Sequence, residues 1–131
     1  MKIKTRYPPN INKIRERFGE IPNSVVFTYG DILYAPKGKN IPKNLRVHEK
    51  VHMKQQGDDP EGWWDKYLTD VDFRLEQEVE AYKKQFGFYR STCKIKSRIP
   101  LFLNRIAKDL SGSIYGNMIG FNDAKKLIEG Q

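Results

Sequence analysis

The sequence predicts a single α+β domain in which an N-terminal β-hairpin, or small sheet, is followed mostly by helices. Three observations favour this class. The chain has 131 residues, which suits one domain with a substantial core. Two β-branched and aromatic runs flank Gly30-Asp31 in the first third of the chain. After Pro42, glycines and prolines separate segments with helical periodicity. We therefore expect residues 1–131 to form one domain.

Turn and capping residues divide the first half of the chain into three elements. Gly30-Asp31, between two β-forming runs, is typical of a two-residue hairpin turn. Pro42 suits the first turn of a helix, and Gly57 suits the residue that ends it. We expect a short helix, a β-hairpin and a longer helix at residues 11–18, 24–35 and 42–56, in that order.

Helices dominate the second half. Asp58-Asp59-Pro60 favours a helix start, and the aromatic patch that follows it, with Trp63 and Trp64, is more typical of core anchoring than of substrate contact. Asp70 is expected to cap a long helix that ends at Gly87. The predicted apolar stripe of this helix is Val71, Leu75, Val79, Tyr82 and Phe86. Two more helices are expected at residues 98–110 and 121–128, the second capped by Asn122.

The predicted helix over residues 42–56 carries a short metal-binding motif. His48 and His52, the only histidines, are four residues apart and so share one helical face, which the periodicity turns away from water. Two imidazole nitrogens at this separation can bind one Zn²⁺, and Glu49 can reach a zinc-bound water. The alternative is a surface helix with two partly buried histidines and an ordinary exposed glutamate.

A third ligand is predicted on the helix that Asp70 begins. Of its three glutamates, Glu78 lies along the edge of the apolar stripe, whereas Glu76 and Glu80 fall on the solvent side. A carboxylate against a core face needs a charge partner, and a zinc ion held by two imidazoles provides one. Three protein ligands leave a fourth position open, as in catalytic zinc sites. The alternative for Glu78 is a structural salt bridge to a nearby Arg or Lys.

These residues resemble the gluzincin metallopeptidases, which carry His-Glu-x-x-His on one helix and a glutamate ligand on a second. The resemblance lies in His48-Glu-x-x-His52 and in Glu78-Val-Glu-Ala-Tyr82. Residues 48–82 are also similar to small phage- or prophage-encoded proteins with an aromatic patch between the two helices. The resemblance implies a zincin-like fold and a zinc cofactor. It also implies the ligands His48, His52 and Glu78, with Glu49 as the general base.

The sequence departs from the gluzincin pattern at Tyr82, where many members have an aspartate that contacts a histidine ligand. We expect that contact to come from elsewhere, with Asp70 and Asp72 as candidates. Without a third histidine, the donor that stabilises the oxyanion is expected to be a tyrosine or the backbone. Tyr82, one turn beyond Glu78, is the first candidate and Tyr115 the second; for both, packing is the alternative role.

Composition and charge limit the setting of this site. The single cysteine, Cys93, excludes an internal disulfide and fits a reducing compartment. With no signal-peptide pattern and no apolar run of membrane-spanning length, we expect a cytoplasmic protein, in the host cytoplasm if it is phage-encoded. The net charge of +8 comes from basic flanks around an acidic middle. Because the basic residues are scattered, an ordinary solvated surface is favoured over nucleic-acid binding.

The sequence therefore leads us to expect zinc-dependent hydrolysis of peptide bonds in a protein or peptide substrate, with Glu49 as the base. The hairpin strand nearest the cleft is expected to hold an extended peptide by edge pairing. The alternative is a zinc-stabilised binding or structural module without catalysis, of the kind used in phage assembly or host interaction.

Overall fold

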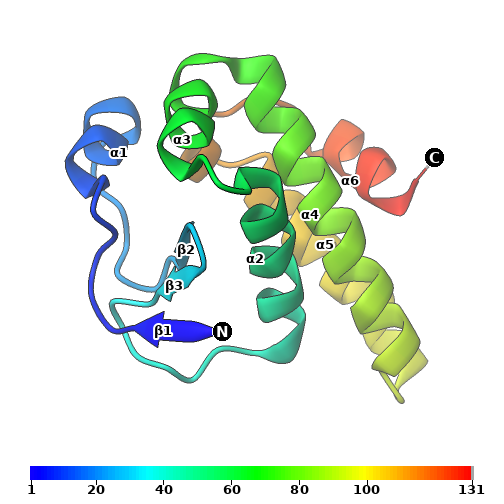
Figure 1. Ribbon diagram of the computed structural model, residues 1–131. Helices are drawn as coiled ribbons and strands as arrows, with labels where there is room; N and C mark the ends of the chain where they lie inside the picture. Colours follow the sequence, from blue (N-terminus) through cyan, green and yellow to red (C-terminus); the bar gives the residue numbers. More distant parts are fainter. Residues whose placement is uncertain (131) are drawn as a thin grey trace.

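The computed structural model describes residues 1–130 and confirms the α+β class. Within this range, one three-stranded sheet and six α-helices are present (Figure 1). The strands are β1 (Lys2–Lys4), β2 (Phe27–Tyr29) and β3 (Ile32–Tyr34). The α-helices are α1 (Ile11–Phe18), α2 (Lys43–Gln56), α3 (Pro60–Thr69), α4 (Val71–Thr92), α5 (Ile99–Leu110) and α6 (Phe121–Glu129). The short 3-10 helices η1 (Lys96–Arg98) and η2 (Ser113–Tyr115) lie on either side of α5. None of the helices in residues 1–130 has the length and apolar character that crossing a bilayer would require.

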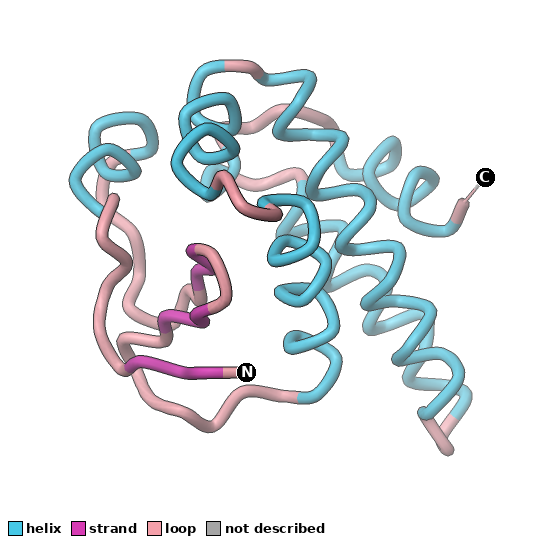
Figure 2. The backbone as a smooth tube through the Cα atoms, viewed as in Figure 1, coloured by secondary structure: helices cyan, strands magenta, loops and turns pink. Residues whose placement is uncertain are grey.

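The predicted hairpin is confirmed, with shorter strands than the sequence indicates. β2 and β3 pair antiparallel with Tyr29 opposite Ile32, and Gly30 supplies the positive φ of 65° that the two-residue turn needs. β1 pairs in parallel with the other side of β3, which gives the strand order β1-β3-β2. No local signal predicts β1, because its three residues gain their structure from a distant partner. β2 is an edge strand and lies against α2 (Figure 2).

The helices α2 and α4 lie side by side, with α3 connecting them (Figure 1). One apolar core joins α4, α5 and α6. A second core joins α1, the hairpin and α3, and it contains Trp63 and Trp64, so their predicted anchoring role is confirmed. The residues that α2 buries are all polar: His48, Glu49, His52 and Gln56. The contact between α2 and α4 therefore carries a polar cluster where a helix pair normally carries an apolar seam.

α4 continues through Gly87 to Thr92, so the prediction that this glycine ends the helix is wrong. The ring of Tyr89, in the additional turn, stacks on Phe102 of α5 with 3.8 Å between ring centroids. Burial of two aromatic rings outweighs the cost of a glycine in a helix, which is about 1 kcal/mol. Tertiary packing, which the local sequence does not reveal, thus extends α4.

The face that α4 buries matches the prediction only in part, because Tyr82 and Phe86 of the predicted stripe are buried but its first residues are not. Val71 is 44% exposed, and Leu75 and Val79 are only half-buried. The inward face is mostly polar or aromatic, and its buried residues are Arg74, Glu78, Ala81, Tyr82, Gln85 and Phe86. Polar side chains occupy this face because Arg74 donates to carbonyls of α3 and η2 and Gln85 donates to Asn44 of α2.

Arg74 is fully buried and connects three elements to α4. Its Nη1 donates a hydrogen bond to the carbonyl of Tyr67 at 2.7 Å, and its Nε donates to the carbonyl of Tyr115 at 3.2 Å. The guanidinium lies over the ring of Phe18, 5.1 Å from its centroid. One side chain thereby fixes the end of α3, the segment η2 and the end of α1 around the site described below.

The C-terminal helices match their predicted positions. α6 begins at Phe121 after Gly120, so Asn122 lies inside the first turn and is not the cap that was predicted. Cys93 follows α4 as a free thiol, and its Sγ lies 3.3 Å from the carbonyl of Ile95.

Candidate metal centre

Two imidazoles from α2 meet inside the protein. The helical repeat of α2 turns His48 and His52 towards α4, and their Nε2 atoms lie 3.1 Å apart. The two residues are 2% and 5% exposed. The predicted inward face is confirmed, and the alternative of two histidines on a surface helix is excluded.

Glu78 of α4 completes a cluster of three donors. Its Oε1 lies 3.1 Å from Nε2 of His48, and its Oε2 lies 3.3 Å from Nε2 of His52. Glu76 and Glu80, by contrast, are exposed, as their helical positions predict. Within residues 1–130 Glu78 forms no ion pair with a lysine or arginine, so the predicted alternative of a structural salt bridge is excluded.

The separations within the cluster suit a metal ion. A tetrahedral zinc ion with bonds of about 2.0–2.1 Å holds its ligand atoms about 3.3 Å apart. The separations between the Glu78 carboxylate and the two imidazoles, and between the imidazoles, are 3.1–3.3 Å. One possible ligand atom from each residue lies within 4.8 Å of the other two. Two nitrogens and one carboxylate, buried together, can therefore hold a metal ion.

The hydrogen bonds of Gln55 fix the tautomer of His52. The Nε2 of Gln55 donates to the carbonyl of Gln77 at 3.1 Å and to Oε1 of Glu80 at 2.7 Å. Both of these groups only accept, so the Oε1 of Gln55 must face His52, where it lies 2.8 Å from Nδ1. Nδ1 then carries the proton, and the lone pair of Nε2 points into the cluster.

His48 is oriented in the same way by a second glutamine. Its Nδ1 lies 2.9 Å from Oε1 of Gln85, whose Nε2 donates to Oδ1 of Asn44 at 2.8 Å. The prediction that Asp70 or Asp72 supplies this contact is wrong. Asp70 instead caps α4 by accepting from the backbone N–H of Phe73, and Asp72 is exposed. Two neutral amides, where the resemblance led us to expect a carboxylate, hold the imidazoles.

Protons take the place of a cation when the cluster contains no metal. Burial by itself raises the pKa of Glu78, but the histidines outweigh it and hold the pKa of this carboxyl well below its ordinary value. Burial likewise lowers the pKa of His52, yet the Glu78 and Glu49 carboxylates outweigh it and raise that pKa to about 9. A cation entering the cluster has to displace this proton.

Glu49 lies in the same buried space as the three donors. Its Oε1 accepts a hydrogen bond from Oγ1 of Thr28 at 2.9 Å, and its Oε2 is 3.7 Å from Nε2 of His48. Burial raises the pKa of the Glu49 carboxyl, although two histidines nearby oppose the shift. Glu49 is only 5% exposed, because β2 covers it.

Three tyrosines surround the cluster, and sequence reasoning missed one of them. Tyr67 of α3 donates from its hydroxyl to Oε2 of Glu78 at 2.6 Å. The ring of Tyr82 packs edge-on against His48, with 4.4 Å between centroids, and its hydroxyl is 2.8 Å from that of Tyr115. Tyr67 lies on α3, whereas the three donors lie on α2 and α4, so no spacing within one helix could have indicated this contact.

A small cavity of about 60 Å³ borders the cluster and Glu49. This space holds a few water molecules but is too small for an extended peptide. Tyr67 and Tyr115 form part of its wall. The remaining cover comes from the end of α1, the following loop and η2, through Phe18, Ile21, Val25, Val26 and Ile114.

The edge of β2 next to α2 is already partly occupied. The carbonyl of Thr28 accepts hydrogen bonds from Nε2 of Gln56 at 2.8 Å and from the indole of Trp64 at 2.9 Å. These donors come from outside the sheet, so this carbonyl belongs to the free edge of the strand. The predicted pairing of an extended peptide with this edge is therefore blocked at Thr28.

Comparison with protein-family models, with curated proteins and with solved structures gives no match for this chain. The resemblance to gluzincins therefore rests on the motif residues and on the cluster that they form.

Proposed function

We propose that this protein is a zinc-dependent metallopeptidase. The observation that carries the proposal is the position of Glu49: a carboxylate with a raised pKa lies beside three converging donors, 3.7 Å from Nε2 of His48. A structural metal site has no need for a further carboxylate at this place, whereas a hydrolytic site needs a base there.

The donor set favours zinc among the common metals. Two imidazole nitrogens and one carboxylate, from His48, His52 and Glu78, are the ligand types and the ligand number of catalytic zinc sites. Bound there, zinc would polarise a carbonyl and lower the pKa of a coordinated water. The neutral Nδ1–H tautomers that Gln55 and Gln85 impose leave both ligand lone pairs available.

Each remaining residue has a role that follows from its contacts. Glu49 accepts the proton of the attacking water and passes it to the leaving amine, while Thr28 holds one of its oxygens in place. Tyr115 lines the cavity and Tyr82 contacts its hydroxyl, which supports Tyr115 as the donor to the oxyanion and Tyr82 as the residue that orients it. The direct donor role that the sequence suggests for Tyr82 stays a prediction.

One observation favours the alternative function, a zinc-stabilised binding or structural module. The cavity of about 60 Å³ cannot accept a peptide while η2 and the loop after α1 cover it. A peptidase must separate these two segments to admit its substrate, and a structural site has no such requirement.

Glu49→Gln separates the two functions. Zinc content is measured in the purified wild type and variant, and cleavage is measured by mass spectrometry on a complex library of peptides. A peptidase keeps its zinc in the variant and loses cleavage by several orders of magnitude, because the base is gone. Glu76→Gln, an exposed change on α4, is the matched control and should leave both unchanged. A wild type that holds zinc but cleaves no peptide of the library, even after its metal has been removed by a chelator and replaced with zinc, would refute the peptidase proposal and support the non-catalytic module.

A further inference from the structure

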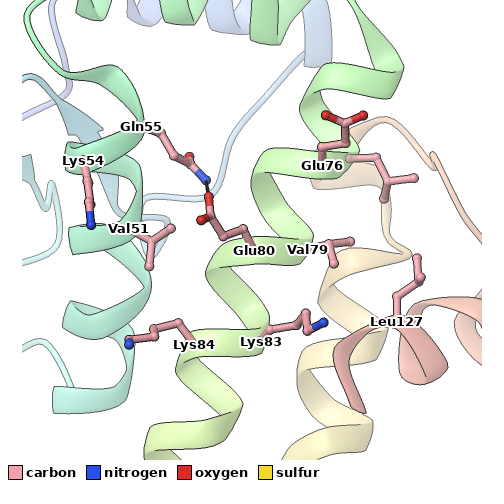
Figure 3. Close-up of a pocket in the computed structure, with 10 residues that line it drawn as sticks. Val51, Lys54, Gln55, Glu76, Val79, Glu80, Lys83, Lys84 and Leu127 are labelled. Carbon is pink, nitrogen blue, oxygen red and sulfur yellow. Dashed lines mark hydrogen bonds between the residues drawn. The ribbon is translucent and has the colours of Figure 1, made fainter. Parts of the chain in front are cut away.

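A groove of about 920 Å³ lies on the outer side of the α2–α4 pair, where α6 approaches it (Figure 3). Its lining is apolar in the middle and charged at the rims. The apolar side chains come from all three helices: Val51, Leu75, Val79 and Leu127. The metal cluster is a separate site, and only Gln55, whose amide contacts both His52 and Glu80, connects the two.

The groove contains Leu75 and Val79 of the α4 apolar stripe, which pack against the core formed by α4, α5 and α6 but are covered only in part by residues 1–130. Leu75 and Val79 are half-buried, Leu127 is 38% exposed, and Val71, one turn before Leu75, is 44% exposed. A run of apolar side chains repeating every four residues is normally buried against another element. Here no segment within residues 1–130 completes that burial, so a partner would gain free energy by covering it.

The charges available around the groove are mostly positive. Lys54, Lys83 and Lys84 line it, are exposed, and form no ion pair within residues 1–130. In Figure 3, Lys84 points towards α2 and Lys83 towards α6. Two glutamates also line the groove: Glu80 accepts a hydrogen bond from the neutral amide of Gln55 at 2.7 Å and keeps its charge, and Glu76 has no hydrogen-bond partner in the described chain. The three lysines therefore outnumber the acidic residues of the lining by one.

We propose that this groove binds an acidic amphipathic helix of a partner protein. The apolar face of that helix packs on Val51, Val79 and Leu127, and its carboxylates pair with the three lysines. From Leu75 to Lys83 the groove follows nine residues of α4, about 12 Å, which matches roughly two turns of a bound helix. Nucleic acid fits less well, because phosphates gain nothing from the apolar floor.

Fluorescence anisotropy with the full chain tests this surface. The probe is a labelled 14-residue helical peptide with leucines at i, i+3, i+4 and i+7 spacing and glutamates elsewhere. The comparison probes are the same peptide with lysine in place of glutamate and a 20-nucleotide single-stranded DNA. The variants are Lys83→Glu with Lys84→Glu, Leu127→Ser, and a control, Lys37→Glu with Lys39→Glu, which changes the net charge equally at exposed residues away from the groove. Circular dichroism verifies that each variant is folded.

We expect the acidic peptide to bind at least about tenfold more tightly than the basic peptide. The Lys83→Glu, Lys84→Glu variant should lose about tenfold or more in affinity, because each reversal turns an attraction into a repulsion. Leu127→Ser should lose affinity severalfold, and the control pair should stay within about twofold of the wild type. Equal binding of both peptides, an equal loss in the control pair, or a preference for the DNA that Leu127→Ser leaves unchanged would each overturn the proposal.

Discussion

Replacing Gln85 tests whether a buried amide sets the metal affinity. Gln85→Leu keeps most of the side-chain volume but removes the oxygen that accepts from Nδ1 of His48. Gln85 is 3% exposed, so water cannot easily replace that oxygen. A buried N–H without a partner costs about 1–3 kcal/mol, which corresponds to roughly 5–150-fold in an equilibrium constant. This range includes the loss of about 10–100-fold in metal affinity that is typical when a metal ligand loses its orienting partner.

Gln55→Leu is the matched comparison, because Gln55 makes the same contact with His52 but lies only half-buried at the wall of the outer groove. Water from the groove can accept the freed Nδ1–H of His52, so we expect a loss of less than about tenfold. Gln85→Glu should recover most of the affinity, since a carboxylate also accepts from Nδ1.

Competition with a chromogenic chelator measures zinc affinity in the wild type and in all three variants, and urea unfolding of the metal-free proteins separates metal binding from stability. If Gln85→Leu and Gln55→Leu lost equal affinity, the argument from burial would be refuted. An unchanged affinity in Gln85→Leu would show that the amide does not orient the ligand.

Three further predictions concern the cluster and its surroundings. Glu78→Ala should lose stoichiometric zinc, and removal of zinc from the wild type by a chelator should lower its melting temperature in calorimetry, while the variant shows no such change. In the metal-free protein the raised pKa of His52 contributes stability that is complete below pH 6.5 and declines as pH rises towards 9. The melting temperature of the metal-free protein should therefore fall over this interval while zinc affinity increases; a metal-free melting temperature that rose would contradict the assigned protonation. Trp64→Phe removes one of two donors to the Thr28 carbonyl, and we expect it to lower the free energy of unfolding in urea by about 1–2 kcal/mol. An unchanged free energy of unfolding would exclude a role for the indole in holding β2.

Local signals in the sequence were sufficient for most of the elements. Gly30-Asp31 between β-forming runs predicted the hairpin, and Asp59 and Asp70 cap α3 and α4 with their side chains, as their residue types suggest. Periodicity also separated Glu78 from Glu76 and Glu80, because the inward direction on one helix follows from its own repeat.

Tertiary contacts determine β1, the end of α4 and part of its buried face, because these features join residues that no local pattern relates. β1 exists through its pairing with β3, and α4 passes Gly87 because Tyr89 stacks on Phe102. The apolar stripe of α4 predicted the burial of Tyr82 and Phe86 but not that of Arg74 and Gln85, which find partners on other elements.

The site shows the same division. The donors His48, His52 and Glu78 could be recognised from residue type and from position on a single helix. Their orientation depends on residues that packing brings to them: Gln85, seven residues beyond Glu78 on α4, contacts His48, and Tyr67 of α3 donates to Glu78. In the same way, Thr28 of β2 holds Glu49. The physical reason is that donors can be recognised one helix at a time, whereas the hydrogen bonds that orient them depend on how the helices pack.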